Sequence, residues 1–164
     1  MIFVTVGTHE QQFNRLVKYM DEWASKHEEK VMIQTGYSTY KPQYCEWKSF
    51  LPYQDMIAMV EKARIIITHG GPSSFIMPLQ IGKTPIVVPR QHKYGEHVND
   101  HQVKFCHQVE ERIGSIIVVD DILKLGEIID IYDEVKIVGD KISNNGKFCA
   151  ELDKIVSEMF KGNL

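Results

Sequence analysis

Short runs of apolar and β-branched residues alternate along the chain with longer segments whose apolar residues recur every three or four positions. Continuous apolar runs predict strands covered on both faces, and these lie at residues 2–6, 31–35, 64–68, 85–89 and 116–119. Residues 44–50 predict one further strand. The helical period is found at residues 9–20, 52–62, 72–81, 97–112, 120–131 and 147–160. This alternation predicts an α/β fold, a single doubly wound domain with a mostly parallel sheet.

Local signals predict where several of these helices begin and end. Thr8 with Gln11 three residues later has the form of a capping box, so the first helix is predicted to begin near His9. Pro72 suits the first position of a helix, and Gly82 ends the helix that Pro72 begins. Thr8 therefore has an ordinary structural explanation as an N-cap residue.

The composition suits one cytoplasmic domain that spans residues 1–164. The chain is 43% hydrophobic and 25% charged, which provides a core and argues against disorder. A net charge of −3 without a basic stripe argues against nucleic-acid binding. No apolar run approaches the roughly 18 residues of a membrane span, and no basic stretch precedes the first strand. We therefore expect a chain that is soluble and not exported.

Cysteine usage and the last amphipathic segment refine this picture. Cys45, Cys106 and Cys149 are widely spaced and form no C-x-x-C pair, which is typical of reduced cytoplasmic thiols. The helix predicted at residues 147–160 could pack on the sheet of this chain or bind a partner helix. Packing on the same chain is the commoner use of an amphipathic helix.

The turn after the strand at residues 64–68 has the features of a phosphate cradle. The sequence His69-Gly70-Gly71-Pro72 allows a sharp turn directly into a helix. Helix N-termini carry free N–H groups and partial positive charge, and Ser73 and Ser74 add hydroxyl donors. The segment that begins at Gly7 also follows a strand, so both turns are predicted to lie at the same edge of the sheet. An anion such as a nucleotide diphosphate suits this edge.

A dense group of polar residues follows the strand at residues 85–89. It begins at Arg90 and continues with Glu96, His97, Asn99, Asp100, His101 and Gln102. The polar positions are more numerous than a helix cap requires, which favours a sugar-sized binding pocket over an ordinary solvated surface. The surface interpretation remains the alternative.

Three known motifs resemble parts of this chain, but each lacks a residue or an element that the motif requires. Gly82-Lys83-Thr84 lacks the first glycine of a P-loop, because Met77 occupies that position, and Pro85 prevents the helix a P-loop needs. The turn after the first strand lacks the G-x-G-x-x-G fingerprint of dinucleotide sites. His97 and His101 have the spacing of metal ligands, but the glutamate of a zincin motif is absent. We therefore expect no metal site and no cofactor.

Four motifs together resemble the glycosyltransferase family 28 C-terminal domain. These are FVTVGT at residues 3–8, HGGPSS at residues 69–74, GKTPIVVP at residues 82–89 and NDHQ at residues 99–102. The closest resemblance is to the soluble catalytic half of split two-subunit glycosyltransferases. This group includes bacterial capsule or exopolysaccharide galactosyltransferases and the eukaryotic dolichol-linked N-acetylglucosaminyltransferase.

The resemblance implies a Rossmann-like domain equivalent to the C-terminal half of a GT-B glycosyltransferase. Such a domain would bind a UDP-sugar donor, and its enzyme would transfer galactose, glucose or N-acetylglucosamine with inversion to a lipid-linked sugar in capsular or exopolysaccharide biosynthesis. A membrane-anchored partner subunit would carry the acceptor site and recruit this chain to the inner face of the membrane. No divalent metal is required.

The resemblance also implies roles for individual residues. Gly7, Thr8 and the residues from His69 to Ser74 would lie near the donor diphosphate, and Asp100, His101 and Gln102 near the sugar hydroxyls. The general base would lie on the partner, and His9 is the only candidate in this chain.

One position departs from the resemblance, and two other functions remain open. Relatives of the peptidoglycan type have a glutamate that holds the ribose, and this chain has Met77 there. The first alternative is a non-catalytic regulatory module that binds nucleotide sugars. The second is a small stand-alone epimerase or hydrolase that acts on nucleotide sugars.

Overall fold

The computed structural model describes residues 1–136. The strands are β1 (Ile2–Thr5), β2 (Val31–Gln34), β3 (Glu46–Lys48), β4 (Ile65–His69), β5 (Ile86–Val88) and β6 (Ile117–Val118). The helices are α1 (Asn14–Ala24), α2 (Tyr53–Lys62), α3 (Pro72–Gln80), α4 (His101–Ile113), α5 (Leu125–Asp130) and α6 (Tyr132–Val135), with 3-10 turns η1 (His92–Tyr94) and η2 (Ile122–Lys124). In this part of the chain no helix has the length and apolar character needed to cross a membrane. The helix predicted at residues 147–160 and Cys149 lie outside the described residues.

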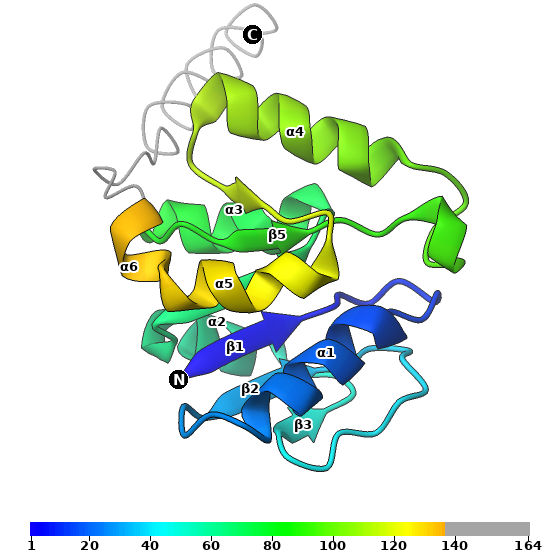
Figure 1. Cartoon of the computed structure of the whole chain (residues 1–164), viewed down its shortest axis with the longest axis vertical. Coiled ribbons are helices and arrows are strands. Elements are labelled where there is room, and N and C mark those ends of the chain that lie inside the picture. The colour runs from blue at the N-terminus through cyan, green and yellow to red at the C-terminus, as the bar shows by residue number, and fades with distance from the viewer. Residues whose placement is uncertain (137–164) are drawn as a thin grey trace, which may run out of the picture.

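The strands form one sheet in the order β3-β2-β1-β4-β5-β6, and every neighbouring pair is parallel (Figure 1). The fold class predicted from the alternation of apolar runs is therefore confirmed. Successive strands build outward in one direction from β1 to β3 and in the other from β4 to β6. In open sheets of this kind, ligands bind at the carboxyl ends of the strands beside the point where the order reverses. Here that point lies between β1 and β4.

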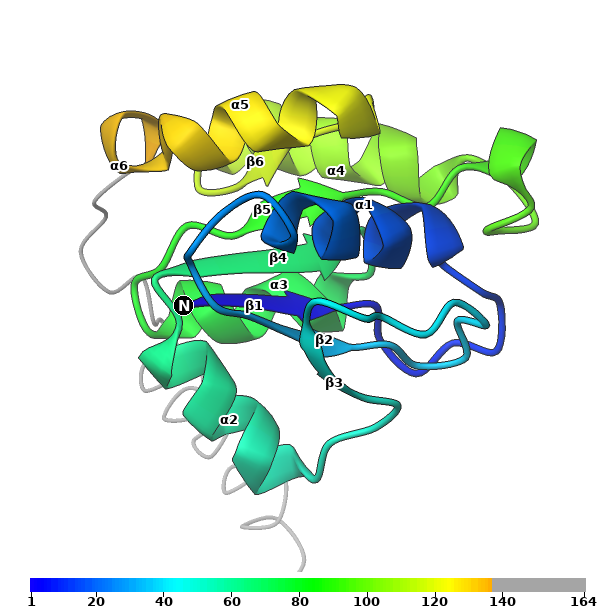
Figure 2. The same cartoon turned by 60° about the horizontal axis from the view of Figure 1, so that its bottom comes forward.

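Helices cover both faces of the sheet. On one face, Val4 of β1 and Ile67 of β4 belong to a core cluster with residues of α1, α5 and α6. On the other face, Phe3 and Ile66 pack with α2, and Val87 packs with α3 and α4. Figure 2 shows α1 and α5 on one side of the sheet and α2 and α3 on the other. Burial on both faces explains the continuous apolar runs of the central strands β1, β4 and β5.

The first helix begins later than the capping-box prediction. Helix α1 begins at Asn14, its N-cap residue is Phe13, and no side chain caps it. The carbonyl groups of Gln11 and Gln12 instead accept hydrogen bonds from the guanidinium of Arg90 at 3.0 and 2.9 Å. The prediction of a helix start near His9 is wrong because a residue distant in sequence binds the carbonyl groups of this segment.

The helix predicted at residues 97–112 also begins later, at His101. Side chains hold the preceding bend: Asn99 Oδ1 accepts the amide of His101 at 3.1 Å, and Asp100 Oδ1 accepts the amide of His92 at 2.8 Å. His97 therefore lies outside the helix and does not share a helix face with His101.

The segment predicted as one helix at residues 120–131 is divided. It consists of the turn η2 followed by α5. Asp121 precedes η2, and its side chain accepts the amide of Leu123 at 3.1 Å. This local bond favours a tight turn at the start of the segment.

Candidate functional site

Three segments meet at the carboxyl edge of the sheet, each directly after a strand. Residues 7–12 follow β1, residues 69–74 run from the end of β4 into α3, and residues 90–100 connect β5 to α4. The structure brings His69 against Gly7 and Gly71, and the ring of His9 within 5.7 Å of the ring of His97, centroid to centroid. Predicted site residues from all three segments thus lie close together.

The imidazole of His69 lies between two glycines. A Cβ atom placed on Gly7 would lie 2.4 Å from Nε2 of His69, and one placed on Gly71 would lie 2.3 Å from Cε1 of the same ring. Gly7 also has a φ of +75°, a conformation that side chains disfavour. Both glycines are therefore required for the ring to occupy this position.

His69 is a neutral hydrogen-bond donor near pH 7. The amide of Gly71 donates to Nδ1 of His69 at 3.0 Å, so the ring proton resides on Nε2. Burial lowers the pKa of His69 to about 4, and the positive charges of Arg90, His9 and His97 act in the same direction. The ring can therefore donate from Nε2 without carrying a charge.

The N-terminus of α3 has no side-chain cap. Gly71 is its N-cap residue and Pro72 occupies the first turn. Ser74 Oγ lies 2.8 Å from the carbonyl oxygen of His69 and 2.6 Å from that of Gly71, so its hydroxyl donates to the backbone. Pro72 and Ser73 are exposed. An uncapped helix N-terminus with a neutral donor beside it favours an anionic group.

Gln102 connects α4 to the ends of β4 and β5. Its Oε1 accepts the amide of Arg90 at 3.2 Å. A Cβ atom on Gly70 would lie 3.0 Å from Cβ of Gln102 and 2.9 Å from Sγ of Cys106, so the glycine allows the helix to approach the strand closely. Burial raises the pKa of Cys106 to about 12, and the thiol is therefore inert. The polar cluster at the start of α4 thus adjoins the glycine turn.

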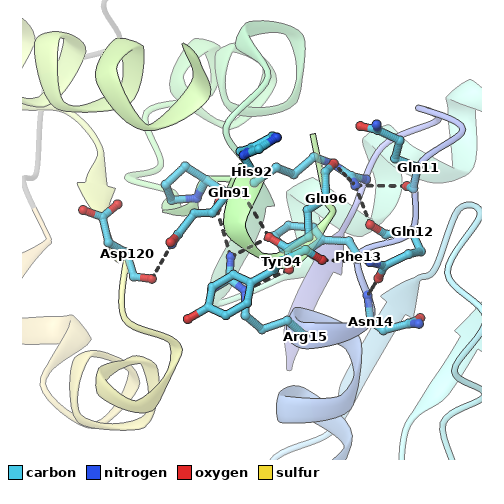
Figure 3. A network of polar contacts seen from close by, with 12 residues as sticks. Gln11, Gln12, Phe13, Asn14, Arg15, Gln91, His92, Tyr94, Glu96 and Asp120 are labelled. Atoms are coloured by element: carbon cyan, nitrogen blue, oxygen red, sulfur yellow. Dashed lines mark hydrogen bonds and ion pairs between the residues drawn. The ribbon is translucent and has the colours of Figure 1, made fainter. Parts of the chain in front are cut away.

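Arg90 and Glu96 were predicted to bind the ligand, and both are buried. The guanidinium of Arg90 donates to backbone carbonyl groups, and burial lowers its pKa to about 10 against the opposing effect of Glu96. The carboxylate of Glu96 binds Arg15 through both oxygens and accepts the amide of Gln91 (Figure 3). Their side-chain contacts are with protein groups.

The other predicted side chains lie at the surface of the edge. Thr8, His9, Asp100 and His101 are exposed, whereas His97 and Asn99 are half-buried. His9 Nδ1 accepts the amide of Gln11 at 3.2 Å, and His97 Nδ1 accepts that of Asn99 at 3.4 Å. Nδ1 of each ring is therefore occupied by a hydrogen bond within its own loop.

Two further expectations concern Met77 and metal binding. Met77 packs with the apolar cluster of Phe3 and Ile66, so it faces the sheet. Within residues 1–136, no three histidine, cysteine, aspartate or glutamate residues are grouped as metal ligands.

Sequence reasoning missed Arg15, which joins two segments of this edge. Its Nε and Nη2 atoms each lie 2.9 Å from a carboxylate oxygen of Glu96, and Nη2 also donates to the carbonyl of Pro89 at 3.0 Å. The sequence does contain a signal for this contact. Arg15 is a charged residue directly before Leu16 and Val17, which belong to the apolar stripe of α1 and are fully buried. A charge in that position needs a partner.

Comparisons with known proteins agree with this architecture. The glycosyltransferase family 28 C-terminal domain matches residues 1–128. No curated protein sequence matches the chain. Among solved structures, the glycotransferase of kitacinnamycin superposes with a TM-score of 0.59 and 18% identity, covering 79% of this chain and 34% of that one. The glycosyltransferase SnogD from Streptomyces nogalater gives a TM-score of 0.48 and 15% identity over 91% of this chain and 42% of its own.

The chain spans about a third of the length of the first of these enzymes, and at this identity the likeness establishes the fold alone. The six-stranded parallel sheet matches the C-terminal halves of GT-B glycosyltransferases. The match over residues 1–128 covers most of the sequence. The chain therefore belongs to the glycosyltransferase family 28 C-terminal domain family.

Proposed function

We propose that this chain is the donor-binding subunit of an inverting glycosyltransferase that uses a UDP-sugar. The observation that carries the proposal is the pairing of neutral His69 with the uncapped N-terminus of α3. Both lie at the carboxyl ends of the strands beside the reversal of strand order, where ligands bind in open parallel sheets. A diphosphate accepts hydrogen bonds only, and this place offers donors.

The donor is held in two parts under this proposal. The diphosphate lies against the first turn of α3, where it accepts from Nε2 of His69 and from backbone amides. The sugar hydroxyls lie against the polar residues at the start of α4, including His101 and Gln102. Thr8 and Ser73 are exposed at the same edge and add hydroxyl groups to it.

The reaction is a displacement at the anomeric carbon of the donor sugar. An acceptor hydroxyl forms a bond to that carbon from the face opposite the diphosphate, and the bond to the diphosphate oxygen breaks with inversion. The acceptor proton passes to a general base, and the electron pair leaves with UDP. The α3 N-terminus and His69 stabilise the charge that develops on the departing diphosphate. The proposed base is a group on the partner subunit, and His9 is the candidate in this chain.

The acceptor half of the active site is proposed to come from a membrane-anchored partner. The family resemblance favours a lipid-linked sugar acceptor in capsular or exopolysaccharide biosynthesis and transfer of galactose, glucose or N-acetylglucosamine. The partner would hold this cytoplasmic chain at the inner face of the membrane. Asp, His and Gln side chains bind any of these sugar hydroxyls, so donor competition must identify the sugar.

Coexpression with a membrane-anchored partner tests the proposal. Label from a UDP-sugar should reach a lipid-linked acceptor only when both subunits are present. Tight UDP binding without transfer would favour the regulatory module. Turnover of the UDP-sugar by the purified chain alone would favour a stand-alone epimerase or hydrolase.

A further inference from the structure

We propose that Arg15, Arg90 and Glu96 form an ionic clamp that positions the loop after β1 against the loop after β5. The three side chains come from α1 and from the segment between β5 and α4. Arg90 and Glu96 are buried, and Arg15 is 12% exposed. The clamp holds the loops that carry His9 and His97, and it does so from beneath the surface where a ligand would bind.

Arg90 supplies the first half of the ionic clamp by binding the backbone of the β1–α1 segment. Its Nη1 lies 3.0 Å from the carbonyl oxygen of Gln11 and 2.9 Å from that of Gln12, and Nη2 lies 2.9 Å from that of Val6. The guanidinium also lies 4.7 Å from the centre of the Phe13 ring. These contacts join residues separated by 78 to 84 positions in the sequence.

Glu96 and Arg15 supply the second half. The two carboxylate oxygens of Glu96 accept from Nε and Nη2 of Arg15, each at 2.9 Å, in a bidentate ion pair (Figure 3). The same carboxylate accepts the amide of Gln91 at 3.0 Å, and Arg15 donates to the carbonyl of Pro89 at 3.0 Å. The first residues of α1 are thereby bound to the residues that follow β5.

The ionic clamp supplies hydrogen-bond donors to the carbonyl groups of a loop that has no regular secondary structure. Residues 7–12 form neither helix nor strand, and buried carbonyl groups without partners are costly. The carboxylate of Glu96 acts on both guanidinium groups, since it pairs with Arg15 and opposes the lowering of the Arg90 pKa. Removing its charge leaves the buried Arg90 and the largely buried Arg15 without this compensation, which is unfavourable.

The role of the ionic clamp in catalysis rests on the proposed function, whereas its role in loop order does not. The loops it joins carry Gly7, which contacts His69, and the pair His9 and His97. Arg15, Arg90 and Glu96 are therefore positioning residues, because their side chains contact protein groups and not the exposed edge. Under this proposal, loosening the ionic clamp weakens donor binding without removing a group that contacts the donor.

Amide hydrogen exchange tests the ionic clamp directly. In Glu96→Gln, we expect exchange of the hydrogen-bonded amides of residues 11–14 to accelerate at least about tenfold, with the amides of β1 and β4 unchanged. Arg15→Lys keeps the charge but loses the bidentate geometry, so a smaller acceleration of the same amides is expected. Glu29→Gln is the matched control, since Glu29 pairs with Arg64 outside this region.

Two exchange results would overturn the ionic clamp. One is unchanged exchange of the hydrogen-bonded amides of residues 11–14 in Glu96→Gln. The other is equal acceleration in β4, which would indicate global destabilisation. Glu29→Gln should leave exchange at residues 11–14 as in the wild type.

Kinetics with the partner subunit separates positioning from stability. A loosened ionic clamp should raise KM for the UDP-sugar at least about tenfold in Glu96→Gln and change kcat less, because the donor-binding loops are displaced. A loss of active protein would lower the apparent kcat and leave KM unchanged, and that result would reject the positioning role. If the wild type neither binds UDP nor transfers sugar, the proposed function fails, and hydrogen exchange still decides the ionic clamp.

Discussion

A Cβ atom on Gly7 would lie only 2.4 Å from Nε2 of His69, so the imidazole ring packs directly against this glycine. The strand end that carries His69 and the turn that carries Gly7 are adjacent because β1 and β4 pair in parallel. The contact links the first turn of the chain to the start of α3. Substitutions at Gly7 should therefore affect both folding and ligand binding.

Gly7→Ala compared with Gly95→Ala separates this contact from backbone strain. Both glycines have positive φ, +75° and +65°, but a Cβ on Gly95 meets nothing within 4 Å. Gly95→Ala should cost about 1 kcal/mol of unfolding free energy from strain alone and leave UDP affinity unchanged. Gly7→Ala should cost about 1 kcal/mol more and weaken UDP binding at least about tenfold. Chemical denaturation and calorimetric titration measure both effects, and equal behaviour of the two variants would argue against the contact.

Gly71 should be coupled energetically to His69. Its φ of −78° suits any residue, so Gly71→Ala or Gly71→Val acts only through the ring 2.3 Å away. We expect Gly71→Val to abolish donor binding. In a double-mutant cycle, Gly71→Ala should be about 1 to 3 kcal/mol less destabilising in a His69→Ala background. Additive effects would show that the ring does not limit the side chain at Gly71.

The stability of the protein should depend on pH through His69. Its pKa is lowered from 6.5 to about 4, so the unfolded chain takes up the proton at a higher pH than the folded chain. The stabilisation is therefore complete above pH 6.5 and is lost as the pH falls toward 4, up to about 3 kcal/mol.

Comparison with His69→Gln isolates this dependence. The difference in unfolding free energy between the two proteins should shrink as the pH falls from 6.5 to 4. His107, whose pKa Asp120 raises, contributes stability that is lost as the pH rises, and this effect is common to both proteins. Parallel stability curves would contradict the assignment of a neutral His69.

Substitutions at the start of α4 should change sugar selectivity more than nucleotide affinity. His101 is exposed, and Gln102 binds the backbone of Arg90 beside the glycine turn. His101→Ala and Gln102→Ala should each reduce discrimination among UDP-sugars while UDP affinity changes about threefold or less. Saturation-transfer NMR competition among UDP-sugars measures this, and an equal loss of UDP affinity would contradict the separate sugar pocket.

Much of the fold follows from local sequence, because the central strands are buried on both faces and are therefore continuously apolar. The run Ile65-Ile66-Ile67 and the run Ile86-Val87-Val88 both become central strands. The short strand β3 was also predicted, within residues 44–50. Strand order depends on how these elements pack, and the alternation of strands and helices was sufficient to predict parallel pairing.

The loop conformations could not be predicted in the same way. The segment before Asn14 has helix-forming signals, but Arg90, which lies 78 residues beyond Gln12, binds its carbonyl groups. Likewise Glu96 was predicted as part of a ligand pocket, and its buried carboxylate binds Arg15 of α1. Contacts over such separations depend on the assembled sheet and leave only a weak local signal.

The glycines of the candidate site illustrate the same limit. Gly70 and Gly71 were recognised as a turn, yet their contacts with Gln102 and His69 depend on the approach of α4 and on the path of β4. Met77 packs inward with the apolar cluster of Phe3 and Ile66. Under the proposed function, ribose recognition would therefore use other groups.

Titration of the labelled chain with UDP, followed by two-dimensional NMR of the backbone amides, shows whether the nucleotide binds at His69 and the N-terminus of α3. The largest shifts should map to residues 7–9 and 69–74, where His69 and the α3 N-terminus meet. Gly71→Val should abolish these shifts while the spectrum remains that of a folded protein. A diphosphate site at this edge would be excluded if UDP at millimolar concentration left these amides unchanged, or if Gly71→Val bound UDP with unaltered affinity.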